Sequence, residues 1–231
     1  MTQRKIAYWV IPPENNAEFV ANMEEILEIY ERPYDASNPV ICMDEQPVQL
    51  IKEARTPIKA TMKEPRRVDY EYERAGTASI FMFTEPLSGW RNATVRPQRT
   101  KADWAFEVAN LLEGRYADKE KITLVCDNLN THTKGAFYEA FEPERARKLV
   151  RRIEFRYTPK HGSWLNIAEN ELSAMTRQCL SNRRIGDIEM LASEIKAWST
   201  DVNKKQRGVD WQMKVGDARI KLKSVYPNIN F

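Results

Sequence analysis

The sequence predicts an α/β fold in which helices cover both faces of a mixed central sheet of about five strands. Short apolar segments at 39–45 and 121–127 carry apolar residues on both faces, as buried central strands do. A pair of antiparallel strands comes before an alternation of strands and helices, and this order is typical of a mixed sheet. With 42% hydrophobic residues, the chain can bury the core that such a sheet needs.

The first part of the chain predicts a helix and a central strand. After an extended lead-in at 1–12, a helix at 13–32 has a single apolar stripe, and we expect it to be a packing or linker helix outside the catalytic core. The strand at 39–45 either continues through 46–53 or bends away there. A basic, proline-broken loop follows at 55–72.

The next strands, 77–84 and 90–96, are joined by a short turn and predict a hairpin. A right-handed crossover after this hairpin would bring the strand at 121–127 beside the strand at 39–45. The remaining elements are helices at 101–116 and 135–149 (interrupted at Pro143), a strand at 152–157, helices at 163–180 and 185–203, and an irregular basic segment at 204–231.

The charge is unevenly distributed along the 231 residues. The net charge is +3, yet residues 1–50 contain three Lys and Arg against nine Asp and Glu, so the remainder carries +9. Basic residues concentrate at 145–156 and 204–223. Either cluster alone is typical of a solvated face, whereas two together favour a phosphate-binding surface.

Neither a membrane span nor a secretory signal is expected. No apolar run approaches the roughly 18 residues of a membrane helix, and the N-terminus lacks a small-residue cleavage pattern. The three widely spaced cysteines, Cys42, Cys126 and Cys179, show no metal-ligand spacing and are expected to be free buried thiols in a reducing cytoplasm.

Two aspartates end the two predicted central strands. Asp44 and Asp127 would meet where the chain reverses direction across the sheet, which is where ligand sites gather. Adjacent carboxylates repel each other, and hard oxygen ligands select Mg²⁺ or Mn²⁺. The alternative is that each is only a turn or cap residue. Glu169 or Glu171 could supply a third carboxylate, and helical phase leaves both open.

Four blocks of the sequence, covering about residues 35–200, resemble the bacterial insertion-sequence branch of the mariner superfamily of DDE transposases. They are DNLNTH at 127–132, PKHGSWLNIAENEL at 159–172, CMDEQ at 42–46 and VDYEYERAGTASIF at 68–81. The resemblance implies a ribonuclease H-like fold and a catalytic, metal-binding triad of Asp44, Asp127 and Glu169. It therefore selects Glu169 over Glu171, and Glu45 and Glu171 become supporting or solvated residues.

The chain departs from the family pattern in two ways. The 41 residues between Asp127 and Glu169 exceed the usual interval, and a longer helix or loop in 133–152 would absorb the difference. We also expect no N-terminal helix-turn-helix domain here. The expected organisation is a lead-in and linker helix at 1–35, a catalytic domain at 36–203 and a basic tail at 204–231.

The resemblance implies a transposase catalytic domain that uses two Mg²⁺ or Mn²⁺ ions for hydrolytic nicking of transposon ends and for strand transfer by the freed 3′-hydroxyl. Its partners would be transposon-end and target DNA, with a homodimer forming on DNA. It would be cytoplasmic, associated with the nucleoid when DNA-bound. The alternatives are a general ribonuclease H-like nuclease and a catalytically silent copy that inhibits the full transposase.

Further residues are expected to assist this site. The supporting candidates lie in the two signature blocks and are Asn128, His132, His161 and Asn166. The candidate DNA contacts come from the basic segments and the loop before the last block. They are Arg147, Lys148, Arg151, Arg152, Lys160, Lys204, Lys205 and Arg207. Trp164 could stack on a base, although core packing is the simpler interpretation.

Overall fold

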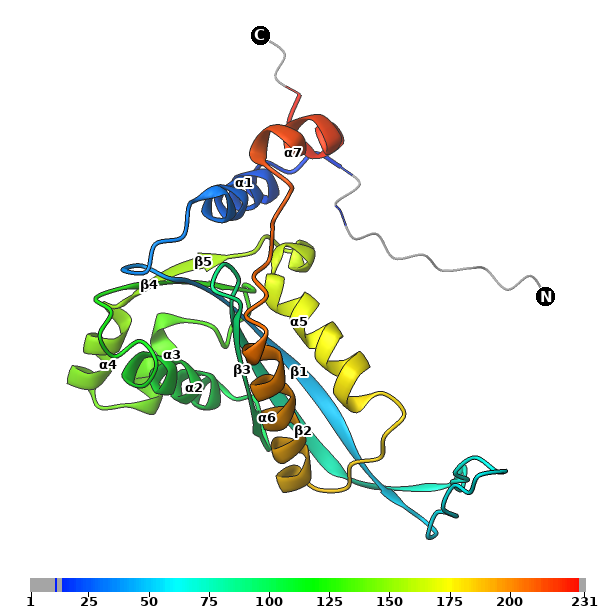
Figure 1. The fold of residues 1–231 in the computed structure, drawn as a ribbon. Coiled ribbons are helices and arrows are strands. Elements are labelled where there is room, and N and C mark those ends of the chain that lie inside the picture. Colours follow the sequence, from blue (N-terminus) through cyan, green and yellow to red (C-terminus); the bar gives the residue numbers. More distant parts are fainter. Residues whose placement is uncertain (1–10, 12–13, 229–231) are drawn as a thin grey trace.

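A single mixed sheet of five strands, in the order β3-β2-β1-β4-β5, organises the computed structural model, which describes residue 11 and residues 14–228 (Figure 1). β1 pairs antiparallel with β2 and parallel with β4, while β2–β3 is antiparallel and β4–β5 parallel. The strands are β1 Val40–Glu53, β2 Tyr72–Glu85, β3 Trp90–Arg96, β4 Ile122–Cys126 and β5 Ile153–Tyr157. The predicted mixed sheet is confirmed.

β1 and β2 are longer than the sequence predicts and leave the body of the protein together as an arm (Figure 1). Residues 46–53 continue β1, which settles one of the open alternatives. β2 begins at Tyr72 because its polar first half pairs with β1 beyond the core, where no apolar face is required. Pro47 is tolerated within β1 because β4 pairs only with Val40–Cys42 and leaves that edge free.

Helices cover both faces of the sheet, as predicted (Figure 1). Strand alternation directs Ile41 and Met43 to one face and Cys42 to the other. On the first face lie α2 Lys101–Glu113, α3 Lys134–Ala140 and α4 Pro143–Val150. On the second face lie α1 Ala17–Glu31, α5 Ile167–Met175 and α6 Ile188–Lys204. No helix in the described part of the chain is long and apolar enough to cross a membrane.

The expectation that the first helix lies outside the core does not hold. α1 buries Met23, Ile26 and Leu27 completely in the cluster that includes sheet residues. Its Tyr30 hydroxyl donates a hydrogen bond of 2.8 Å to the carbonyl of Leu165, just before α5. α1 is therefore part of the layer that positions α5. The lead-in expected at 1–12 lies outside the described residues, apart from residue 11.

The predicted irregularity of the C-terminal segment is also wrong in part. It contains α7 Val215–Lys221 and a short 3-10 turn, Lys223–Val225, and both pack on α1 (Figure 1). Arg219 makes a two-pronged contact with Glu24 of α1, at 2.8 and 2.9 Å. Between α6 and α7 the chain is extended, and Trp211 packs on Tyr30. Part of the basic tail is thus used within the fold.

Two predicted helices divide at identifiable places. Pro143 separates α3 from α4, as expected, and these two helices take up the long interval between Asp127 and Glu169. The helix predicted at 163–180 divides into a 3-10 turn (Ser163–Leu165), α5, and a π-helical turn (Thr176–Leu180). α6 begins after Asp187, whose side chain accepts a hydrogen bond from the Met190 N–H.

A buried ion pair fastens α5 to the far edge of the sheet. Arg91 of β3 donates two hydrogen bonds, of 2.7 and 2.8 Å, to the carboxylate of Glu171. Both side chains are almost wholly buried. Asn203 of α6 joins the same group by bonding the Arg91 backbone in both directions. Glu171 is therefore a structural acid and not a solvated one.

Replacing Glu171 by Gln should destabilise the fold strongly, because the Arg91 guanidinium would remain buried without its counter-charge. We expect a loss of about 3 kcal/mol in the free energy of unfolding, measured by urea denaturation. Asp201→Asn, which removes the exposed pair with Lys205, is the control and should cost less than about 1 kcal/mol. Equal effects of the two substitutions would contradict the assignment.

Candidate active site

Asp44 and Glu45 are neighbours in β1 that serve opposite faces of the sheet. Asp44 shares the face of Cys42 and lines an open cleft beneath α5. Glu45 shares the other face and is buried against His132. The alternation of a single strand thus places one carboxylate at a cleft and the next inside the protein.

Asp127 lies beside Asp44 because of the register between β1 and β4. Cys42 is paired with Val125, so the same parallel register carried two residues further places Asp127 opposite Asp44. Adjacent strands are roughly 4.8 Å apart. The expectation that the two strand-end aspartates meet at the reversal point agrees with this register.

Glu169 reaches the cleft from the first turn of α5, and Asn166 determines where that turn begins. The Asn166 side chain accepts a hydrogen bond from the Ala168 N–H and donates one of 2.8 Å to the carbonyl of Met43, the residue before Asp44. The helix start is therefore fastened to β1 next to the first aspartate. Glu169 lines the same cleft as Asp44.

The raised pKa of Asp44 shows that its negative charge is not balanced by a positive charge in the cleft. Burial and, to a smaller extent, the negative charges of Asp127 and Glu169 together raise the pKa of Asp44 to about 7. The Glu45 backbone N–H, 2.7 Å from Asp44 Oδ1, and the His132 side chain lower the pKa but do not compensate. A carboxylate with this environment is a site for positive charge, either a proton or a cation.

His132 occupies the other side of the pair. It is fully buried, its Nε2 lies 3.1 Å from Glu45 Oε1, and its Nδ1 lies 2.5 Å from Asp127 Oδ1. Burial alone would lower the pKa of His132, but its contacts with Asp127, Cys126 and Glu45 outweigh burial and raise the pKa well above its ordinary value. His132 thus lies between two carboxylates, which favour its protonated form.

The residues of the cleft fit a divalent cation by their chemistry. Asp127 Oδ1 is buried, and its close contact with His132 lacks hydrogen-bond geometry, so the oxygen has no hydrogen-bond partner. Among the described residues, no three acidic, His or Cys side chains already converge on one ion position. Binding would thus require the repelling carboxylates of Asp44, Asp127 and Glu169 to turn toward one another.

The other predicted supporting residues differ in their surroundings. Asn128 is exposed beside Asp127. His161 is also exposed, with a φ of 64° that places it in the left-handed region, which His adopts more often than most non-glycine residues. Trp164 packs against the core cluster, in agreement with the simpler interpretation. Of the predicted supporting residues, His132 bonds Glu45 of β1 and Asn166 bonds the carbonyl of Met43 in the same strand.

Most predicted DNA contacts lie away from the cleft. Arg147, Lys148 and Arg151 occupy the end of α4, which leads into the start of β5, whereas Asp127 follows the end of β4. The length of a five-residue strand, roughly 15 Å, separates the two levels. Arg152 donates hydrogen bonds to the carbonyl of Leu112 at the end of α2 and to that of Lys119 in the loop that follows, so its guanidinium is used within the fold.

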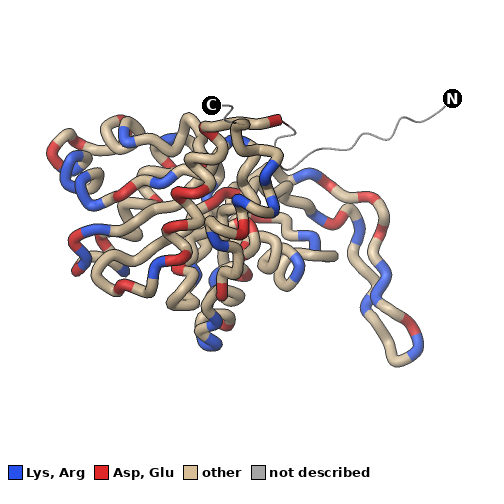
Figure 2. The backbone as a smooth tube through the Cα atoms, turned by 90° about the horizontal axis from the view of Figure 1, so that it is seen from above, with Lys and Arg blue, Asp and Glu red and all other residues tan. Residues whose placement is uncertain are grey.

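The second basic group also lies away from the aspartates. Lys204, Lys205 and Arg207 are at the end of α6, where the Gln206–Arg207 backbone packs against Gly89 of the β2–β3 turn. That turn adjoins the beginning of β1. Lys160 alone of the eight candidates follows a strand at the end where Asp127 lies. In the view of Figure 2, basic and acidic residues are interspersed along the backbone.

The sequence prediction missed Arg177 and the burial of Glu45. Arg177, in the π-helical turn after α5, is an exposed cation that lines the cleft with Asp44 and Glu169. Two turns of helix separate it from Glu169, and this spacing could have placed both on one face. The pairing of Glu45 with His132 could not be predicted, because it joins residues 87 positions apart.

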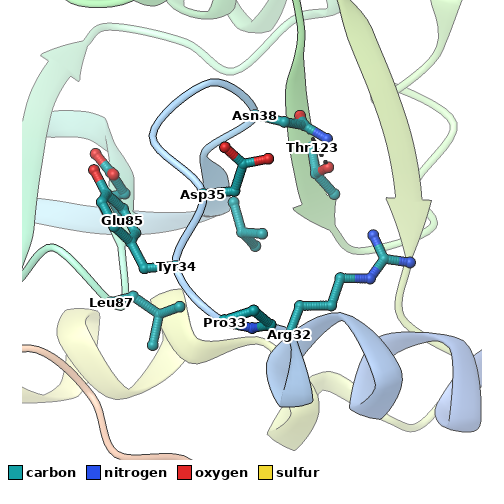
Figure 3. A pocket seen from close by; sticks show the side chains of 9 residues that line it. Arg32, Pro33, Tyr34, Asp35, Asn38, Glu85, Leu87 and Thr123 are labelled. Atoms are coloured by element: carbon teal, nitrogen blue, oxygen red, sulfur yellow. Dashed lines mark hydrogen bonds between the residues drawn. The ribbon is translucent and has the colours of Figure 1, made fainter.

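A second pocket lies at the opposite end of β1 and β4 (Figure 3). It is lined by Tyr34, Asp35 and Thr123, among others. Its acidic side chains already have partners: Glu85 accepts a hydrogen bond from the Tyr116 hydroxyl, and Asp35 accepts two from Ser37. In the cleft beneath α5, by contrast, neither Asp44 nor Glu169 forms an ion pair with a described residue, and the pKa of Asp44 is raised. This cleft is therefore the candidate active site.

Several solved structures of the Mos1 mariner transposase have a fold similar to that of this chain. The paired-end complex with Mn has 16% sequence identity and a TM-score of 0.53 over 87% of this chain and 60% of that chain. The paired-end complex with Mg has 14% sequence identity and a TM-score of 0.56 over 98% of this chain and 68% of that chain. The catalytic domain of the Mos1 transposase has 14% sequence identity and a TM-score of 0.52 over 82% of this chain and 85% of that chain. The TM-scores, and not the low sequence identities, show the shared ribonuclease H-like fold.

The present chain spans about 60% of the length of the first of these structures. A comparison with curated proteins gives no match. A comparison with protein families matches the DDE superfamily endonuclease over residues 39–192, two thirds of the chain and the whole of the sheet with α2 to α5. On this match, the chain belongs to the DDE superfamily endonuclease family.

Proposed function

We propose that the chain is the catalytic domain of a DNA transposase from the bacterial insertion-sequence branch of the mariner superfamily. Asp44, Asp127 and Glu169 would hold two Mg²⁺ or Mn²⁺ ions. The observation that carries the proposal is a cleft lined both by Asp44 of β1 and by Glu169 from the first turn of the capped helix α5, with Asp127 placed level with Asp44 by the β1–β4 register. Membership of an endonuclease family supports phosphodiester hydrolysis as the reaction class.

Metal ions bound there would supply the positive charge that activates a water or 3′-hydroxyl nucleophile and stabilises the leaving oxygen. The protein residues have separate tasks. Asp44 and Asp127 are held at one level by the β1–β4 register, and Asn166 holds Glu169 above them. Arg177 lies at the cleft margin, where its guanidinium can contact a phosphate of bound DNA.

The proposed substrates are transposon ends and target DNA, and a homodimer would assemble on DNA. Support comes from the Mos1 structures, which are paired-end and strand-transfer complexes of that transposase. We also propose that Lys160, at the same end of the sheet as Asp127, contacts the DNA backbone near the cleaved bond. DNA that reaches Arg147, Lys148 or Arg151 would lie beyond the cleavage site.

Incubation with labelled element-end duplex and Mn²⁺ tests the activity. We expect cleavage at the ends by the wild type, and a loss of at least 100-fold in Asp127→Asn and in Glu169→Gln, because each removes a charged ligand. Ser173→Ala, at the margin of the same cleft, is the matched control and should retain activity. Cleavage without end preference would indicate a general nuclease, and intact binding without cleavage would indicate a silent copy.

The stability of the metal-free protein should depend on pH through Asp44. Its pKa is about 7 in the fold and about 3.9 in an unfolded chain, so between these values the folded state binds more protons and stability falls as pH rises. Asp44→Asn should therefore raise the free energy of unfolding at pH 8 by roughly 2–4 kcal/mol and change little at pH 4. Chemical denaturation at both pH values measures this difference. If Asp44→Asn were less stable than the wild type at pH 8, the conclusion that the charge of Asp44 is unbalanced in the fold would be contradicted.

Arg177→Gln should weaken DNA binding and reduce the slope of log K against log salt by about 1, because one phosphate contact is lost. A short duplex centred on the cleavage site is the suitable ligand, measured by fluorescence anisotropy at several salt concentrations. Arg147→Gln, at the end of α4, should leave binding of this duplex unchanged. The reverse pattern would place the DNA on the other end of the sheet.

A further inference from the structure

We propose that His132 is a positioning residue that presents Asp127 to the metal ions by clasping it against Glu45 of β1. Glu45, His132 and Asp127 are together called the clasp. The inference rests on the proposed metal-dependent function and adds a role for two residues outside the acidic triad. It stands on the contacts, burial and strand alternation of these three residues.

Both ring nitrogens of His132 are engaged. Nε2 lies 3.1 Å from Glu45 Oε1, while Nδ1 lies 2.5 Å from Asp127 Oδ1 and 3.1 Å from the Asp127 carbonyl oxygen. A ring bound on both sides cannot turn without losing one of these partners. His132 therefore restricts the carboxylate of Asp127, which otherwise stands at the start of an exposed loop.

The clasp is sealed from water and supported by its surroundings. The side chain of His132 is fully buried and that of Glu45 is 3% exposed. Trp104 of α2 stacks on the imidazole with ring centroids 5.2 Å apart. The Tyr157 hydroxyl of β5 donates a hydrogen bond of 2.8 Å to the His132 carbonyl. Side chains from β1, α2 and β5 thus contact one histidine, and together they hold its ring in a single position.

Strand alternation connects the clasp to the cleft. Glu45 is the residue after Asp44, and Glu45 bonds His132, which in turn forms a close ion-pair contact with Asp127. These contacts relate the two aspartates from behind the sheet. The acids facing the cleft need no direct contact to keep their spacing. This arrangement corresponds to the partners that orient metal ligands in many proteins, whose loss typically lowers metal affinity about 10- to 100-fold.

A double variant separates positioning from stability. His132→Phe keeps the aromatic stack on Trp104, and Glu45→Leu removes the carboxylate that would otherwise remain buried alone. We expect the His132→Phe/Glu45→Leu protein to fold with a melting temperature near that of wild type. Its affinity for Mn²⁺, measured by calorimetry on the full chain without DNA, should fall 10- to 100-fold.

Two further variants complete the test. Glu45→Gln retains an oxygen that can accept from Nε2 and should keep Mn²⁺ affinity within about threefold of wild type. Phe137 of α3 packs on Trp104 and does not belong to the clasp. Phe137→Leu therefore perturbs the same core and should also retain the wild-type Mn²⁺ affinity. A double variant that binds Mn²⁺ like wild type would overturn the positioning role. If Asp127→Asn binds Mn²⁺ as wild type does, the proposed metal site itself fails and the clasp falls with it.

Discussion

Mutual repulsion of carboxylates at the end of two parallel strands is the constraint on which the rest of the structure depends. Asp44 and Asp127 are brought level by the β1–β4 register, and Glu169 is added from above. Burial and, to a smaller extent, the neighbouring charges of Asp127 and Glu169 raise the pKa of Asp44, which reflects the cost of this arrangement. The fold tolerates it because both faces of the sheet carry apolar layers, whose burial offsets the local cost.

The acids around the cleft differ by whether the fold supplies them with a cation. Glu171 has Arg91 and Glu45 has His132, and both are buried structural groups. Asp44 and Glu169, only one and two residues away in sequence, face the cleft instead. The contrast follows from strand alternation in β1 and from the turn of α5, so a shift of one residue in either element would exchange the roles.

The sequence was sufficient to predict the mixed sheet and the helices on both faces, because these follow from apolar patterns and the order of elements. The register of β1 and β4 agrees with the expected proximity of Asp44 and Asp127. The sequence could not separate Glu169 from Glu171 by helical phase, because both flank the apolar stripe; the partner Arg91 lies 80 positions away. α7 was missed because its seven residues carry too short a pattern, and the arm because paired strands outside a core need no apolar face.

The location of positive charge likewise required the three-dimensional structure. The basic clusters are dense in sequence, but Arg152 is used at the end of α2 and its neighbours lie beyond a strand's length from Asp127. The less conspicuous Arg177 lines the cleft. Density of charge in sequence is therefore a weaker guide to a phosphate contact than position relative to the carboxyl ends of the strands.

The central claim is that Asp44, Asp127 and Glu169 form a metal site. The most direct test is anomalous diffraction from crystals soaked in Mn²⁺. The account predicts anomalous density in the cleft, bounded by carboxylate oxygens of Asp44 and Asp127, with Glu169 completing the site. Manganese bound elsewhere, with these three side chains remaining apart, would contradict it.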